Sequence, residues 1–208
     1  MILTVANLKG GTSKTTSAAF LAHALAERGR RVLVVDADPQ ASITRWAEMA
    51  EWRLPVVGKA TGRLHVELEE IVGDRFDAVV IDTPPTDKLR GIVESAIRAA
   101  TTVLVPIGPT SAEYERTAAV QELIEDVGAL NRHNRSPLAA ALLVRTVAGA
   151  ASTGVYRDML TEDGWTVLRG SVPRREVFAQ AFGGPVERAS ATGYGDALDE
   201  LVKVEVSA

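Results

Sequence analysis

The sequence predicts an α/β fold in which helices flank a doubly wound, mostly parallel sheet. Short apolar runs alternate along the chain with helical patterns, which is the element order of a parallel sheet wound with helices. Several apolar runs, such as Val32–Val35 and Val79–Ile81, are uninterrupted, as in strands that are buried on both faces. Folds of this kind bind ligands outside the carboxyl ends of the strands. We therefore look for functional residues at those ends.

The expected strands cover residues 1–6, 31–36, 77–82, 102–107 and 138–145, with a weaker strand at 165–168. The expected helices cover residues 15–28, 41–51, 64–72, 87–99, 112–127, 151–162, 174–182 and 190–203. Gly29 suits the end of the first helix, and Ser111 followed by two acidic residues suits a capped helix start. Residues 52–63 follow no regular pattern. The 208 residues fit one domain over residues 1–208, and we expect no helix-turn-helix ahead of it.

Composition excludes several classes of protein. The hydrophobic content of 46% and charged content of 24% are ordinary for a globular domain. No run of about 18 apolar residues and no secretory signal is present, so we expect no membrane segment. Cysteine is absent, which excludes disulfides, thiolate chemistry and Cys-ligated iron–sulfur clusters and fits a reducing cytoplasm. His23, His65 and His133 lack metal-site spacing, and we expect structural or surface roles for them.

A phosphate-binding turn is predicted between the first strand and the first helix, where residues 7–16 read Asn-Leu-Lys-Gly-Gly-Thr-Ser-Lys-Thr-Thr. Backbone N–H groups point into such a turn, and the helix N-terminus adds partial positive charge. Lys14 is placed to reach terminal phosphates, and the Thr15 hydroxyl to ligate Mg²⁺. The general pattern G-x-x-x-x-G-K-[ST] does not match, because Leu8 and Ser13 occupy its glycine positions. The variant K-G-G-x-x-K-T-[ST] does match, and it adds a second lysine, Lys9.

Carboxylates follow two of the expected strands. Asp36 and Asp38 stand at the end of the strand that contains Val32–Val35, and an acid at a sheet end is costly unless a cation or water needs it. We expect Asp38 to orient an attacking water. Asp82 ends the strand at 77–82 and, behind a phosphate loop, suits Mg²⁺ held through water. The loop after residues 103–107 is expected either to line the site or to be a simple turn.

These segments resemble the deviant Walker-type ATPases of the ParA/MinD group, and they are most similar to small ParA-type (ParF-like) plasmid partition ATPases. The resemblance covers essentially the whole chain and is carried by residues 9–16, 34–40, 80–82 and 105–107 in order. Residues 143–146 and 172–175 are similar to the segments that enclose the adenine in this group. The resemblance therefore implies nucleotide-binding roles for Arg145, Thr146 and Pro173.

The resemblance also implies ATP or ADP and Mg²⁺ as cofactors, in a cytoplasmic, nucleoid-associated protein. The phosphates would be held by Gly10, Gly11, Thr12, Ser13, Lys14, Thr15 and Thr16, and Mg²⁺ by Thr15, Asp82 and Asp36. Lys9 would cross to the nucleotide of the other subunit in an ATP-bound homodimer. That dimer would bind DNA without sequence preference, and a centromere-binding (ParB-type) partner protein would stimulate slow hydrolysis and release it.

Ser13 is the one departure from the family pattern, which has glycine before the phosphate lysine. If the position required a positive φ, serine would cost about 1–2 kcal/mol. A right-handed helical Ser13 would instead place a hydroxyl near the phosphates at little cost. Because Lys14, Thr15, Asp38 and Asp82 are all present, we expect the helical conformation.

Basic residues are unevenly distributed in a chain with a net charge of −4. Residues 129–188 carry arginines 132, 135, 145, 157, 169, 174, 175 and 188 against five acidic residues. The candidates for DNA contact are Arg157, Arg169, Arg174, Arg175 and Arg188, and Arg174 or Arg145 could serve the nucleotide instead. Solvated helix faces are the alternative interpretation of the same residues.

Other classes share the phosphate loop. A MinD-like membrane-surface or protein-cargo positioning ATPase would need a basic amphipathic C-terminal helix to reach a membrane, whereas residues 195–206 are acidic. An ATP-dependent metabolic synthetase, of the dethiobiotin synthetase type, would need a substrate pocket lined by extra residues. An iron-protein-like electron donor is excluded by the lack of cysteine. A tyrosine kinase of the superfamily would need a C-terminal tyrosine cluster, where only Tyr194 lies.

Overall fold

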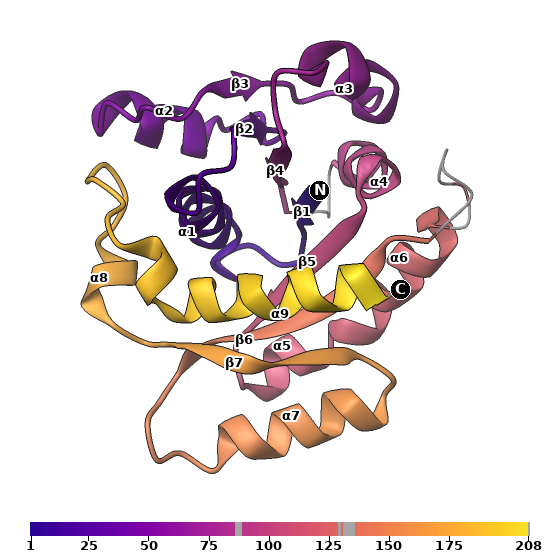
Figure 1. Cartoon of the computed structure of the whole chain (residues 1–208). Helices are drawn as coiled ribbons and strands as arrows, with labels where there is room; N and C mark the ends of the chain where they lie inside the picture. Colours follow the sequence, from indigo (N-terminus) through magenta and orange to yellow (C-terminus); the bar gives the residue numbers. More distant parts are fainter. Residues whose placement is uncertain (86–88, 129, 131–135, 208) are drawn as a thin grey trace.

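A seven-stranded parallel sheet forms the centre of the protein (Figure 1). The computed structural model describes residues 1–85, 89–128, 130 and 136–207, with the side chains of 204–207 excepted. In spatial order the strands are β3 (Val56–Gly58), β2 (Val32–Asp36), β4 (Ala78–Asp82), β1 (Ile2–Val5), β5 (Thr102–Ile107), β6 (Leu138–Thr146) and β7 (Thr166–Pro173). All neighbouring pairs run parallel. The doubly wound α/β prediction is thus confirmed.

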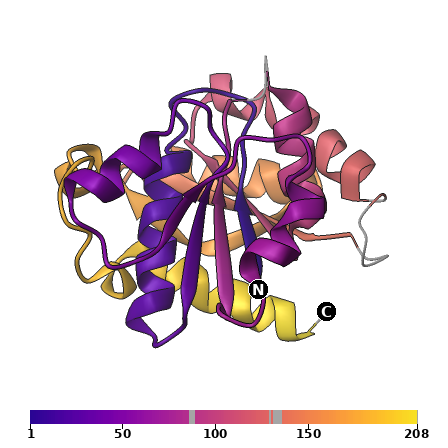
Figure 2. The same ribbon diagram turned by 90° about the horizontal axis from the view of Figure 1, so that it is seen from above.

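Helices cover both faces of the sheet (Figures 1 and 2). On one face α1 (Lys14–Glu27), α2 (Ser42–Met49) and α9 (Gly193–Ser207) bury side chains in a common core. On the other face lie α3 (Leu64–Val72), α4 (Arg90–Ala99), α6 (Thr117–Gly128) and α7 (Ser152–Glu162). The central strands β2 and β4 are buried along their whole length, because helices cover them from both sides. Burial of this kind accounts for their uninterrupted apolar sequences.

The N-terminal helix α1 is buried from Ser17 to Leu25 except at His23. Its buried residues are mainly alanines and other small side chains, together with Phe20 and Leu21. Small side chains let the helix axis approach the sheet closely. Phe20 stacks on Tyr194 of α9, with ring centroids 5.3 Å apart, and the Ser17 hydroxyl donates to the Tyr194 oxygen at 3.2 Å. The helix that follows the predicted phosphate turn is therefore fixed against both the sheet and α9.

Four secondary-structure predictions need correction. β3 was expected to be irregular, but Val56 and Val57 pair with β2. β7 extends to Pro173, well beyond the expected 165–168. In consequence the expected helix at 174–182 shrinks to the short α8 (Glu176–Ala179). The expected helix at 112–127 consists of two, α5 (Ser111–Tyr114) and α6.

β7 lies at an edge of the sheet and is irregular in two places. Its pairing with β6 shifts register between Ala141 and Leu143 and again between Val144 and Thr146. At the first irregularity Glu200 of α9 accepts hydrogen bonds from the backbone N–H groups of Arg169 and Gly170, both at 2.7 Å. The guanidinium of Arg157 donates to the Leu168 carbonyl. Side chains thus satisfy backbone groups that the bulge leaves unpaired.

Hydrogen bonds to the last residue of α1, Glu27, also connect this helix to the 3₁₀ turn η1 (Ala189–Ala191). The Glu27 carboxylate accepts hydrogen bonds from the backbone N–H groups of Ala189 at 2.9 Å and Ser190 at 2.8 Å, and from the Ser190 hydroxyl. This carboxylate fixes the chain immediately before α9 begins.

Among the described residues, no helix combines the length and apolar character that crossing a membrane requires.

Candidate functional site

The predicted phosphate loop connects the end of β1 to the start of α1, at the carboxyl edge of the sheet. Asn7 anchors it, because its side-chain amide donates to the Pro106 carbonyl of β5 at 2.8 Å while its oxygen accepts from the Lys9 N–H at 3.1 Å. The Thr12 hydroxyl donates to the Lys9 carbonyl at 3.3 Å and is buried. Thr15 and Thr16 are half-buried in the first turn of α1. The loop is therefore held between two strands before any ligand arrives.

Two residues of this loop have a left-handed backbone conformation. Gly11 has φ 73°, which glycine adopts freely. Ser13 has φ 67° and ψ 22°, so our expectation that it is right-handed helical is wrong. The loop has a left-handed residue immediately before α1, a conformation that the glycine of the resembled family pattern would adopt freely. This chain places an L-residue with a β-carbon there, which carries the conformational cost.

Lys14 begins α1 and is buried, with only 7% of its surface exposed. Its ammonium donates to the Lys9 carbonyl at 2.9 Å. Burial lowers the pKa of Lys14, while the nearby carboxylates of Asp82 and Asp38 act to raise it. A phosphate placed in the loop would add negative charge beside this ammonium and so favour its charged form.

Asp82 is the most strongly perturbed acid of the site. It ends β4, lies opposite Asp36 in the β2–β4 ladder, and is fully buried. Burial raises the pKa of Asp82 to about 7; Thr15 and Lys14 act to lower it, and Asp36 and Asp38 act to raise it. Neither carboxylate oxygen has a hydrogen-bond partner of good geometry among the described residues. A buried carboxyl group without partners is costly, which is the condition that a bound cation would relieve.

Asp36 and Asp38 are held by hydrogen bonds that the sequence did not reveal. Asp36 accepts from the Asp38 N–H at 3.1 Å and from both the N–H and the hydroxyl of Thr44, at 3.0 and 2.7 Å. Since Thr44 lies in the first turn of α2, Asp36 fixes the start of that helix to β2. Asp38 is half-buried and accepts from the Gln40 N–H at 2.9 Å. Its carboxylate acts on the pKa of both Lys14 and Asp82, so the three acids share one site.

The donor set fits Mg²⁺ held largely through water and phosphate. Among the described residues, no group of three or more His, Asp or Glu side chains converges as a protein-only metal cage. Mg²⁺ in phosphate sites takes only one or two protein oxygens and keeps several waters. The unpartnered Asp82 and the adjacent Thr15 hydroxyl suit that arrangement.

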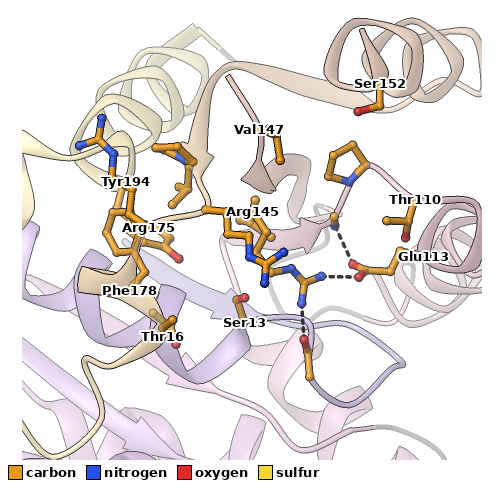
Figure 3. A pocket seen from close by; sticks show the side chains of 18 residues that line it. Ser13, Thr16, Thr110, Glu113, Arg145, Val147, Ser152, Arg175, Phe178 and Tyr194 are labelled. Atoms are coloured by element: carbon orange, nitrogen blue, oxygen red, sulfur yellow. Dashed lines mark hydrogen bonds and ion pairs between the residues drawn. The ribbon is translucent and has the colours of Figure 1, made fainter. Parts of the chain in front are cut away.

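A cavity of about 680 Å³ opens beside the phosphate loop (Figure 3). Its walls come from the loop and α1, the β5–α5 connection, the ends of β6 and β7, α8 and α9; they include Gly11, Ser13, Thr16, Gly108, Pro109, Arg145, Pro173, Arg174, Phe178 and Tyr194. The volume is in the range of small-molecule sites. Of the residues expected around an adenine, Arg145 and Pro173 line the cavity. Thr146 does not: it is buried, and its hydroxyl donates to the Val172 carbonyl at 3.5 Å.

Arg145 reaches the phosphate loop from β6. It is the extra residue of the second β6–β7 irregularity and has φ 56°. Its guanidinium donates to the Gly11 carbonyl and forms an ion pair with Glu113 of α5. Figure 3 shows both contacts inside the cavity. Sequence reasoning gave Glu113 a role only at the start of a helix, because no local pattern pairs it with a residue 32 positions away.

The Lys9 side chain is exposed and takes part in none of the ion pairs among the described residues. The candidate DNA-binding arginines are dispersed. Arg174 and Arg175 are exposed beside the cavity, whereas Arg169 and Arg188 are exposed elsewhere. Arg157 is half-buried, with one nitrogen bonded to β7. Arginines 132 and 135 and His133 lie outside the described residues.

Comparison with known proteins identifies the family. Residues 3–186 match the CobQ/CobB/MinD/ParA nucleotide binding domain. The carboxysome distribution protein A of Halothiobacillus neapolitanus is 31% identical over 183 residues, which cover 86% of this chain and 82% of that protein. Protein ParA of Rhizobium radiobacter is 25% identical over 182 residues, covering 87% and 82%. Cobyrinic acid a,c-diamide synthase of Mycobacterium smegmatis, solved with ADP and magnesium, superposes with a TM-score of 0.70 at 25% identity, over 91% and 92% of the two chains.

The chain belongs to this nucleotide-binding family, and it is an ATPase of the ParA/MinD type. ATP or ADP and Mg²⁺ are its cofactors.

Proposed function

We propose that this ATPase drives DNA partition: its ATP-bound dimer binds DNA without sequence preference and is released after a ParB-type partner stimulates hydrolysis. ParA-family proteins act as ATP-bound dimers with partner proteins. The observation that carries the dimer half of the proposal is the contrast between the two lysines of the loop. Lys14 is buried and bonded within its own loop, whereas Lys9 is exposed and has no ion-pair partner among the described residues. Lys9 is therefore free to face a second subunit.

Within each subunit the described side chains suit phosphoryl transfer to water. Lys14 and the loop amides from Gly10 to Thr16 would bind the β- and γ-phosphates. Thr15, Asp82 and the Asp36 water shell would hold Mg²⁺, which supplies charge neutralisation on the phosphates when it is bound. Asp38 would orient the attacking water. Lys9 would neutralise charge on the partner subunit's nucleotide, which makes the dimer depend on ATP.

The DNA half of the proposal rests on arginines. Arg169, Arg174, Arg175 and Arg188 are exposed, and a dimer would double whatever basic surface they form. Affinity carried by phosphate contacts falls steeply as salt is raised, because bound counterions are released. Arg157 is the weakest of the five candidates, since β7 already engages its guanidinium.

A second candidate function, the positioning of a protein cargo, is favoured by the relative that is named for carboxysome distribution. Such a function would use the same nucleotide switch with a different partner. A metabolic synthetase also shares the fold.

Binding to a random-sequence DNA duplex, followed by fluorescence anisotropy, tests the proposal. The protein should bind in ATP–Mg²⁺, fail to bind in ADP–Mg²⁺ or without nucleotide, and lose affinity as salt is raised. Absence of DNA binding in every state, with ATP hydrolysis intact, would overturn the partition role and favour a protein cargo.

A further inference from the structure

Glu113 lies in the wall of the nucleotide cavity, and the phosphate-loop pattern assigns it no role. We infer that Glu113 is a positioning residue: through Arg145 it holds the phosphate loop in the shape that binds nucleotide. The inference rests on the nucleotide-binding half of the proposed function and is independent of the DNA-binding half.

One contact anchors Glu113 to the backbone, and two more connect it through Arg145 to the phosphate loop. One carboxylate oxygen accepts a hydrogen bond from the Gly108 N–H at 2.6 Å, and the other forms the ion pair with Arg145. Arg145 in turn donates to the Gly11 carbonyl. The side chain of Glu113 is only 10% exposed, whereas that of Arg145 is 37% exposed, so the carboxylate partner of the ion pair is the one shielded from water. A continuous bonded path thus runs from α5 through the end of β6 to the phosphate loop (Figure 3).

The neighbouring backbone is shaped around this ion pair. A β-carbon on Gly108 would lie 2.7 Å from an Arg145 nitrogen and 2.9 Å from a Glu113 oxygen, so a larger residue at position 108 would force the ends of these two side chains to shift. Arg145 itself has a left-handed backbone at a bulge in β6. Such a conformation persists in an L-residue only where its surroundings fix it; here they are the β6–β7 pairing on either side of Arg145 and the side-chain contacts with Glu113 and Gly11.

The contact with Gly11 has a direct consequence for phosphate binding. A trans peptide is planar, and its C=O and N–H point in opposite directions. By holding the Gly11 carbonyl, Arg145 therefore also sets the direction of the Thr12 N–H, which is one of the loop amides expected to face the phosphates. The two residues on either side of Thr12 have left-handed backbones, so the loop has little other regular structure to hold that peptide.

Charge supports the same assignment. A lone carboxylate in a cavity that accepts a polyphosphate would repel the ligand. Pairing with Arg145 cancels that charge, so Glu113 can position the arginine without a net electrostatic cost to nucleotide binding.

Glu113→Gln tests the inference with little change of shape, because glutamine keeps an oxygen for the Gly108 N–H but loses the charge. The Kd of a fluorescent ADP analogue with Mg²⁺, measured by anisotropy, should rise about tenfold. Gly108→Ala should raise the Kd in the same direction, since its β-carbon displaces the ion pair. The matched control is Glu115→Gln, an exposed neighbour, which should leave the Kd unchanged.

A double-variant cycle separates positioning from direct contact. If Glu113 acts only through Arg145, Glu113→Gln should cause no further loss of affinity in an Arg145→Gln background; it should leave the Kd unchanged or lower it, because the carboxylate is then unpaired and repels the phosphates. An equal loss in both backgrounds would mean that Glu113 touches the nucleotide, and would overturn the inference. The inference would also be overturned if Glu113→Gln lowered the melting temperature of the nucleotide-free protein but left the Kd for the ADP analogue at its wild-type value. If the wild-type chain did not bind nucleotide, the proposed function and the Glu113 inference would both be overturned. If the wild type binds nucleotide and only the Glu113 variant behaves differently from expectation, the inference alone is overturned.

Discussion

At the scale of single residues, the phosphate loop contains conformational strain that the family pattern avoids. Ser13 takes the left-handed conformation that the loop requires, with a φ of 67°. The cost falls on the residue immediately before Lys14, whose ammonium the same loop already engages. Glycine at position 13 would avoid this cost.

Replacing Ser13 with glycine should raise the free energy of unfolding of the nucleotide-free protein by about 1 kcal/mol, because glycine adopts a positive φ without steric cost. Urea denaturation followed by circular dichroism measures the change. Ser13→Ala is the matched control: it also removes the hydroxyl but keeps the β-carbon, and should give no gain. Equal stability of the glycine and alanine variants would show that the backbone is not the source of strain.

Sequence reasoning at this scale located the acidic residues of the site, and the roles given to them stay predictions. Asp36, Asp38 and Asp82 meet with Lys14 at the carboxyl edge, as expected for residues that end adjacent parallel strands. It was wrong for Ser13, because the backbone angle depends on the loop as a whole. Sequence reasoning also missed the Glu113–Arg145 ion pair and the Asp36–Thr44 hydrogen bonds. Only the fold brings these residues together, and their spacing in the sequence does not indicate a contact.

At the scale of elements, carboxylates join segments that the chain does not connect directly. Glu27 on α1 accepts three hydrogen bonds from Ala189 and Ser190, immediately before α9. Partial burial alone would raise the pKa of Glu27, but the hydrogen bonds from Ser190 and Ala189 outweigh it and lower the pKa. The ionised form is therefore the one that the folded state prefers.

Glu27→Gln should destabilise the protein at neutral pH and have a diminishing effect in acid. A carboxyl group with a lowered folded-state pKa contributes its full stability above its ordinary value of 4.5 and loses it as the pH falls through the folded-state value. Thermal unfolding of the wild type and the variant at pH 7 and at successively lower pH measures the difference. Glu51→Gln is an exposed control. A gap in melting temperature that stays constant down to pH 3 would contradict the assignment.

Element predictions were most accurate for the buried central strands and least accurate at the sheet edges. β2, β4 and β5 are continuous apolar runs because both faces are covered. β3 has only three residues, between Pro55 and Lys59, too few to show a pattern. β7 contains Arg169, Gly170 and Ser171, which look like loop residues; the bulge and the Glu200 carboxylate accommodate them.

At the scale of the whole molecule, the exposed Lys9 of the phosphate loop can act in the proposed mechanism only by contacting a second subunit. Lys9→Ala should therefore bind nucleotide about as well as the wild type but lose its ATP-dependent dimer. Light scattering at micromolar protein, with ATP–Mg²⁺ and with ADP–Mg²⁺, reports the mass. Lys59→Ala, which removes a positive charge that is already paired with Glu67 within the same subunit, should dimerise normally. A full dimer of the Lys9 variant would remove this residue from the proposed contact.

The two open borders of the sheet bear on how copies of this protein can assemble. One border is the three-residue β3, which follows Pro55; at the other, β7 is bulged, and side chains from Glu200 and Arg157 already engage its backbone at Leu168, Arg169 and Gly170. Neither presents a long, flat row of free backbone groups on which another chain could template a strand. Both borders therefore lack the feature that favours cross-β pairing between chains. The geometry of these borders favours assembly through loops and helices instead, and such segments also line the nucleotide cavity.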